Sequence, residues 1–113
     1  MRYMLLHKTN DKLEAGLPPD ADVLARADAV LEEMRQAGVL LLAEGLMPSS
    51  RGARIAFADS SPRVVDGPFT ETKELVAGVS IIRVDCKDEA VRWALRFADG
   101  DPGTDIDILE LAD

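Results

Sequence analysis

Two apolar segments decide the fold of this chain, Val39-Leu40-Leu41-Leu42-Ala43 and Val79-Ser80-Ile81-Ile82-Arg83-Val84. Both carry apolar side chains at odd and at even positions, which is typical of strands that are buried on both faces. Glu44 and Gly45 end the first segment. The pattern therefore predicts two strands in a sheet that is apolar on both sides.

The segments around these two strands predict the remaining elements. A run of apolar residues at helical spacing precedes the first segment, in a helix that Asp20 or Asp22 begins and Gly38 ends. A second helix is expected from near Asp85 to Gly100. We also expect strands at 3–8 and 106–109, an irregular connection at 11–20, a hairpin of 53–58 and 63–65 around a turn at 59–62, and one helical turn within 70–75.

The order of the elements is strand, helix, strand, hairpin, strand, helix, strand. It predicts an α+β fold, a ferredoxin-like βαβ-βαβ sandwich with an inserted hairpin, whose helices both lie on one face of the sheet. Leaving several Leu and Ile side chains in water on the other face would forgo several kcal/mol, at about 25 cal/mol per Å². We therefore expect a second copy of the chain to cover that face in a twofold homodimer.

The composition limits the partners of the chain. Its 113 residues include 13 Lys and Arg against 21 Asp and Glu, which gives a net charge of −8 with the single His neutral. This balance argues against a nucleic-acid or anionic-membrane surface, because either needs a basic patch. One cysteine excludes an internal disulfide or a Cys-cluster site, and no metal or cofactor is expected. With no signal-peptide core and no apolar run of roughly 20 residues, a single cytoplasmic domain is expected.

One polar stretch is too particular to be generic loop chemistry. Asp66-Gly67-Pro68-Phe69-Thr70-Glu71-Thr72-Lys73-Glu74 resembles the signature of the YCII-related family, in the subgroup of DGPF-domain proteins, and the segments 1–6, 37–46 and 89–94 agree in the family's order. The resemblance implies a dimeric α+β barrel in which two ferredoxin-like sheets pack face to face. Relatives in the wider group look like small lyases or hydrolases with a proposed His–Asp pair at a cleft near the dimer interface.

The resemblance assigns the group's aspartate to Asp66, whereas Met47 stands where close relatives often have a histidine. As a catalytic residue, Asp66 would act as a general base beside a cleft, with Glu44 or Glu71 as a neighbouring acid. As a structural residue, its carboxylate would accept the backbone N–H groups that follow it and fix the turn. The two roles are compatible.

His7 and Glu44 complete the predicted catalytic set. His7 is the side chain whose ordinary pKa lies nearest to neutrality, although a histidine at a strand end is often merely half-buried. Glu44 ends a buried strand, so its carboxylate is expected near an interface or a cleft edge. In the predicted binding set, Lys73 neutralises an anionic group, Glu71 holds the ammonium and Thr70 belongs to the same polar cluster. The alternative for that cluster is a solvated helical turn capped by Thr70 or Thr72.

Two hypotheses of function follow. The first is a protein that binds a small molecule, with a small anion as one candidate, in a cleft near the dimer interface; as an enzyme it would carry out acid/base chemistry. The alternative is a non-catalytic accessory or ligand-sensing domain linked to transcription regulation, because other DGPF-type domains occur beside extracytoplasmic-function sigma factors. An active cleft requires Asp66 and a second ionisable group to converge on an open pocket.

Overall fold

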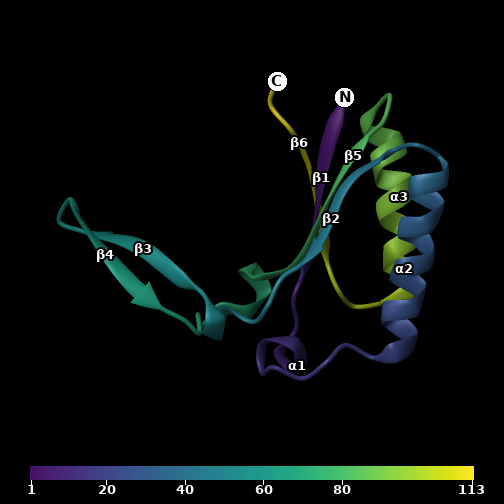
Figure 1. Ribbon diagram of the computed structural model, residues 1–113. Coiled ribbons are helices and arrows are strands. Elements are labelled where there is room, and N and C mark those ends of the chain that lie inside the picture. The colour runs from purple at the N-terminus through teal and green to yellow at the C-terminus, as the bar shows by residue number, and fades with distance from the viewer.

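The computed structural model describes residues 1–113, apart from the side chain of Lys73. Its fold is mixed α+β, with a four-stranded antiparallel sheet and a separate two-stranded sheet. In chain order the elements are β1 (Arg2–Lys8), α1 (Asp11–Glu14), α2 (Ala21–Gln36), β2 (Leu40–Gly45), η1 (Ser49–Arg51), β3 (Ala53–Ala58), β4 (Ser61–Asp66), η2 (Thr72–Glu74), β5 (Val76–Arg83), α3 (Lys87–Gly100) and β6 (Ile106–Glu110). Figure 1 shows α2 and α3 over one face of the larger sheet, while β3 and β4 project away from it on the other side.

The larger sheet has the strand order β2-β5-β1-β6, and all of its neighbouring strands are antiparallel. Leu5 on β1 lies opposite Ser80 on β5 and opposite Ile108 on β6. Because successive side chains of a strand point to opposite faces, Tyr3, Leu5 and His7 share one face with Ser80. Leu5 and Ser80 are fully buried there, so this is the face that α2 and α3 cover.

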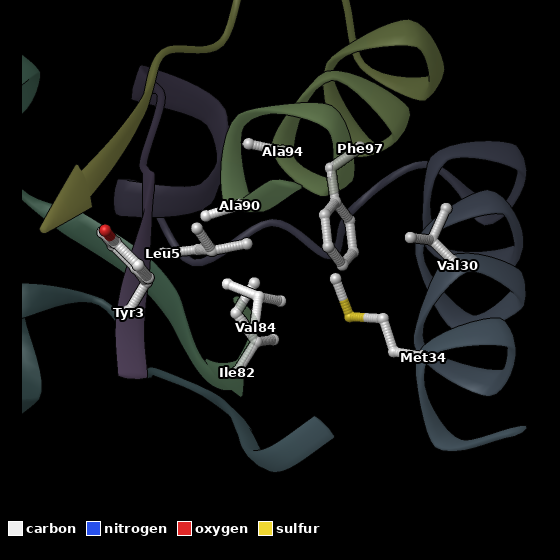
Figure 2. Packing of buried hydrophobic residues seen from close by; sticks show 9 residues of the cluster. All are labelled: Tyr3, Leu5, Val30, Met34, Ile82, Val84, Ala90, Ala94 and Phe97. Atoms are coloured by element: carbon white, nitrogen blue, oxygen red, sulfur yellow. The ribbon is translucent and has the colours of Figure 1, made fainter. Parts of the chain in front are cut away.

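The hydrophobic core lies between that face and the two helices. Figure 2 shows Phe97 of α3 next to Met34 of α2, with Leu5 and Ile82 of the sheet to their left. Ala90 of α3 is fully buried, and a small side chain at this position lets the helix approach the sheet closely. The complete core consists of Tyr3, Leu5, Val30, Met34, Ile82, Val84, Ala90, Ala94 and Phe97.

The other face of the larger sheet carries no helix of the described chain. Leu109 pairs with Met4 on this face, and Met4 pairs in turn with Ile81. The side chains of Leu42 and Leu109 are 40% and 54% exposed. The prediction of an apolar second face is therefore confirmed, and in the single chain water reaches it.

The segment 11–20 differs from the irregular connection predicted for it, because its first residues form the short helix α1. The side chain of Asn10 supplies the missing signal: its Oδ1 accepts the Leu13 N–H at 2.9 Å and caps the helix. Asp20 precedes α2 as predicted, but its side chain makes no capping hydrogen bond. Its Oδ1 accepts instead from Lys12 Nζ at 2.6 Å, which ties the two ends of the connection together.

The hairpin and β5 form where they were predicted; β3 has the predicted bounds, whereas β4 and β5 are longer than predicted. The hairpin turn is Asp59–Ser60 alone, with φ values of 48° and 70° at the two residues, so β4 begins at Ser61 and includes Pro62. Positive φ at both central residues matches the right-handed twist of paired strands in a two-residue turn. β5 begins at Val76 rather than at 79, because Val76 and Gly78 pair with residues of β1.

The Asp66–Pro68 turn at the base of the hairpin is fastened to the body of the protein through Ser49. The Gly67 N–H donates to the Gly52 carbonyl at 3.0 Å, and the Phe69 N–H donates to Ser49 Oγ at 2.9 Å. The Ser49 hydroxyl donates to the carboxylate of Glu14, which also accepts the Ser49 N–H at 3.2 Å. One serine therefore joins α1, η1 and the turn.

Gly67 has no room for a side chain, because an added Cβ would overlap the backbone carbonyl of Ser49. Gly67→Ala should lower the free energy of unfolding by about 2–3 kcal/mol, since backbone atoms rather than a flexible side chain must move. At Gly52 the nearest atom to an added Cβ is 3.5 Å away, an ordinary contact. Gly52→Ala is the matched control and should cost less than about 1 kcal/mol. Equal costs in urea titrations of the two variants would contradict this account of the turn.

Candidate functional site

A cavity of about 680 Å³ lies between the helix-covered face of the larger sheet, α2, and the segment that contains α1. Its volume is within the range of small-molecule sites, roughly 300–1,000 Å³. The floor includes Ala43, Gly78 and Ser80 of the sheet, and α2 contributes a mainly apolar wall. Other apolar lining residues are Leu13, Leu17, Pro18, Val23, Ala27, Leu31, Leu46, Met47, Phe97 and Ile106.

A histidine and a serine meet on the wall of this cavity. His7 Nε2 lies 3.3 Å from Ser80 Oγ, and both residues line the cavity. The edge of one ring meets the face of the other where His7 packs on Phe97, with ring centroids 4.7 Å apart. Ser80 is 1% exposed, so its hydroxyl depends on His7 as a hydrogen-bond partner. The pair is a polar group in the wall of a largely apolar, half-open cavity.

Burial lowers the pKa of His7 below its ordinary value of 6.5, because the charged imidazolium loses its solvation there. The imidazole is therefore neutral at pH 7, with one ring nitrogen able to accept a proton. Which nitrogen accepts depends on the tautomer, and the direction of the Ser80 hydrogen bond follows from it. A neutral imidazole beside a hydroxyl has the chemistry of a general base or of a hydrogen-bonding anchor.

The structure brings two of the predicted catalytic residues to this cavity. His7 lies on its wall, and Glu44 borders it at the exposed end of β2. On β2, Ala43 pairs with the buried Ser80 and shares its helix-covered face. Glu44, the next residue, pairs with Val79 and points to the opposite face.

The other predicted site residues lie elsewhere. Asp66, Thr70 and Glu71 are exposed and are not among the described residues that line the cavity. Asp66 pairs with Ala53 at the open end of the hairpin, and the N–H groups of Gly67 and Phe69 donate to Gly52 and Ser49 rather than to Asp66. The side chain of Lys73 is outside the described residues, so its predicted role stays a prediction.

Sequence reasoning missed Ser80 as part of the site. One signal could have found it: Ser80 is a polar residue inside an apolar strand, two positions from Ile82 on the same face. A hydroxyl at such a position needs a partner. His7 could not be chosen as that partner without the register of β1 and β5.

The fold and the cavity define a class, a small α+β protein with an apolar cavity between a sheet and its helices. None of the described helices is long and apolar enough to span a membrane. The chain belongs to the YCII-related domain family, whose model matches residues 1–111. It is similar to an uncharacterized protein of Rhizobium meliloti (strain 1021), at 28% identity over 106 residues that cover 92% of this chain and 86% of the relative.

The lowered pKa of His7 predicts a pH-dependent stability. As pH falls below 6.5, the unfolded chain binds a proton that the folded chain accepts only at lower pH. The free energy of unfolding should therefore fall as the pH is lowered from about 7 to the pKa of His7 in the folded chain. Below that pKa the loss is complete. Because His7 is the single histidine, the slope in this window should flatten in His7→Gln. Urea titrations at several pH values test this, and parallel curves for the two proteins would contradict it.

Proposed function

We propose that this protein binds a small, mainly apolar molecule in the 680 Å³ cavity and holds a hydroxyl or carbonyl group of that molecule at His7 and Ser80. The observation that carries the proposal is the partly buried polar pair of His7 and Ser80 in a cavity whose lining is largely apolar. Binding sites of this kind combine apolar surface with a few placed polar groups that set orientation. The anionic ligand expected from Lys73 has no such support.

The same pair suits acid/base chemistry on the bound molecule. A neutral His7 can accept the proton of a ligand hydroxyl or of an acidic C–H, and Ser80 then orients the imidazole. The edge-to-face contact between Phe97 and His7 limits rotation of the imidazole ring. The ring nitrogens of His7 therefore keep a fixed direction. Turnover would make the protein an enzyme, and binding without turnover is what a ligand-sensing domain requires.

Within the family, we assign the chain to the DGPF-type subgroup and to the cytoplasm as proposals. The stretch from Asp66 to Glu74 supports the first, and the unpaired thiol of Cys86 is compatible with the second. The proposed fold is the ferredoxin-like unit of a dimeric α+β barrel. Its support is the order β2-β5-β1-β6 with both long helices on one side.

The proposed dimer packs the helix-free faces of two copies together. Met4, Leu42, Ile81 and Leu109 lie on this face, and water reaches Leu42 and Leu109 in the single chain. Each such side chain that becomes buried contributes roughly 1.5–3 kcal/mol. A twofold arrangement buries the same patch on both copies at once.

The binding proposal is tested with phenol and benzene, which share a ring and differ by one hydroxyl. In NMR titrations, phenol should shift the amide signals around His7 and Ser80 and bind more tightly than benzene. Ser80→Ala should weaken phenol binding by about 5- to 30-fold, the equivalent of 1–2 kcal/mol for a buried hydrogen bond. Benzene binding should be nearly unchanged in that variant.

The benzene arm serves as the control for a distorted cavity, because a variant that loses both ligands has changed its shape. Phenol shifts that map to the Asp66 turn instead of the cavity would overturn the proposed site. Equal dissociation constants of the unmodified protein for phenol and benzene, from titrations carried to saturation, would also overturn it.

The dimer is tested by two leucines of equal exposure on opposite sides of the molecule. Leu109 on the sheet is 54% exposed and Leu95 on α3 is 56% exposed. Leu109→Lys places a charge in the proposed interface and should weaken the dimer at least about 10-fold. Leu95→Lys should leave it unchanged. Sedimentation equilibrium measures both, and an unmodified protein that is monomeric at micromolar concentration contradicts the dimer.

A further inference from the structure

The hairpin of β3 and β4, residues 53–66, extends away from the rest of the molecule as an arm. Its two strands form a sheet of their own, and Figure 1 shows them on the side opposite to α2 and α3. The Cα radius of gyration is 15.5 Å, whereas a compact chain of this length has about 13 Å. A two-stranded hairpin alone in water is marginally stable, so an arm of this form needs a surface to rest on.

One face of the arm is apolar and exposed to solvent. In the register of the hairpin, Ile55 lies opposite Val64 and Phe57 opposite Pro62, so these four side chains share a face. Ile55, Phe57 and Val64 are 59%, 72% and 71% exposed. Arg54 and Arg63 belong to the opposite face, where Arg54 stacks on Phe69 with 4.1 Å between the guanidinium carbon and the ring centroid. The arm therefore has one apolar side to cover and one polar side for solvent.

A second apolar surface borders the cavity. Four of its large apolar lining residues are exposed by half or more, and we call them the cavity rim: Leu17, Leu24, Leu46 and Met47, at 54%, 50%, 50% and 63%. The apolar side of the arm and the cavity rim do not meet within one chain, because the arm leaves the sheet on the side away from the helices.

Charge does not oppose contact between the arm and a cavity rim of another copy. The arm carries two arginines and two aspartates and has no net charge, although the whole chain carries −8. Among the described residues that line the cavity, Lys8 and Arg35 stand against four carboxylates, those of Glu14, Asp28, Glu44 and Asp101. A neutral arm therefore meets no charge repulsion at this acidic lining, whereas most other surfaces of an acidic chain would be repelled there.

The length of the arm matches the distance it must span. Six residues of extended strand measure about 20 Å, and two packed sheets lie about 10 Å apart. An arm that starts at one sheet therefore passes the partner's sheet and reaches the layer between that sheet and its helices, where the partner's cavity lies. Both the arm and the cavity belong to the same end of the sheet, because Gly45 and Val76 line the cavity and lead into the segments that carry the hairpin.

We propose that the arm packs its apolar side on the cavity rim of a second copy of this chain, so that Phe57 of each subunit helps to close the cavity of the other. The inference rests on the face-to-face dimer proposed above and is independent of what the cavity binds. A twofold axis makes the exchange reciprocal and closes the assembly at two copies. About half of the 26 residues in the four strands of the larger sheet point to the helix-free face. A standard interface takes about 20–30 residues from each partner, and the two arms supply much of the difference.

The apolar side of the arm is tested with two adjacent valines of β4. Val64→Asp puts a charge on the apolar side, and Val65→Asp puts the same charge on the polar side of the same strand. Val64→Asp should weaken the dimer about 10-fold or more in sedimentation equilibrium, while Val65→Asp should change it less than about 3-fold. Equal effects of the two substitutions would overturn the inference.

Contact between the arm and the cavity rim is tested by a disulfide between copies. In a Cys86→Ser background, a Phe57→Cys protein and a Met47→Cys protein are mixed and oxidised. A covalent dimer should form in the mixture and not in either protein alone, because tip and rim meet only across the interface. If the unmodified protein is a dimer that Leu109→Lys dissociates, and the mixture yields no covalent dimer, the arm does not reach the rim and only the sheet contact stands. A monomeric protein overturns both, while leaving the phenol titration of the cavity to decide the binding proposal.

Discussion

Two helices can cover one face of a four-stranded sheet, and the strands of this protein carry apolar side chains on both faces. On the covered face, Leu5 and Ile82 are fully buried against α2 and α3. On the other face, Leu42 and Leu109 remain in contact with water. This imbalance between apolar surface and available cover underlies the proposed dimer, and it also gives a reason for an arm that extends toward the uncovered side.

The covered face is not uniformly packed, and its one polar pair marks the candidate site. Toward one end of the sheet the core of Phe97 and Met34 gives way to a cavity, and there Ser80 meets His7. Burial has opposite consequences for the two groups. It obliges the hydroxyl to find a partner, and it keeps the imidazole neutral by lowering its pKa. Both effects suit the pair to the proposed contact with one polar group of a bound molecule.

The signature turn has a structural explanation that does not involve the cavity. Gly67 accommodates the carbonyl of Ser49, and Phe69 donates its N–H to the Ser49 hydroxyl while Arg54 stacks on its ring. Glu14 holds the same serine from α1. Through these contacts the turn sets the direction in which the arm leaves the body. The most recognisable stretch of the sequence thus fixes the arm to the body, whereas His7 and Ser80 of the candidate site lie outside that stretch.

The order of strands and helices, the apolar second face and the position of the hairpin could be predicted from the sequence, because each depends on periodicity and turn residues within a short window. The helix α1 was missed because its start is marked by a single capping side chain, that of Asn10. His7 was a candidate from its pKa alone, but Ser80 became its partner only through the register of β1 and β5, which joins residues far apart in the chain. The cavity likewise exists only once α2 has packed on the sheet. Local patterns therefore determined which elements form, whereas the pairing of strands decided which side chains meet, because register depends on the packing of the whole sheet.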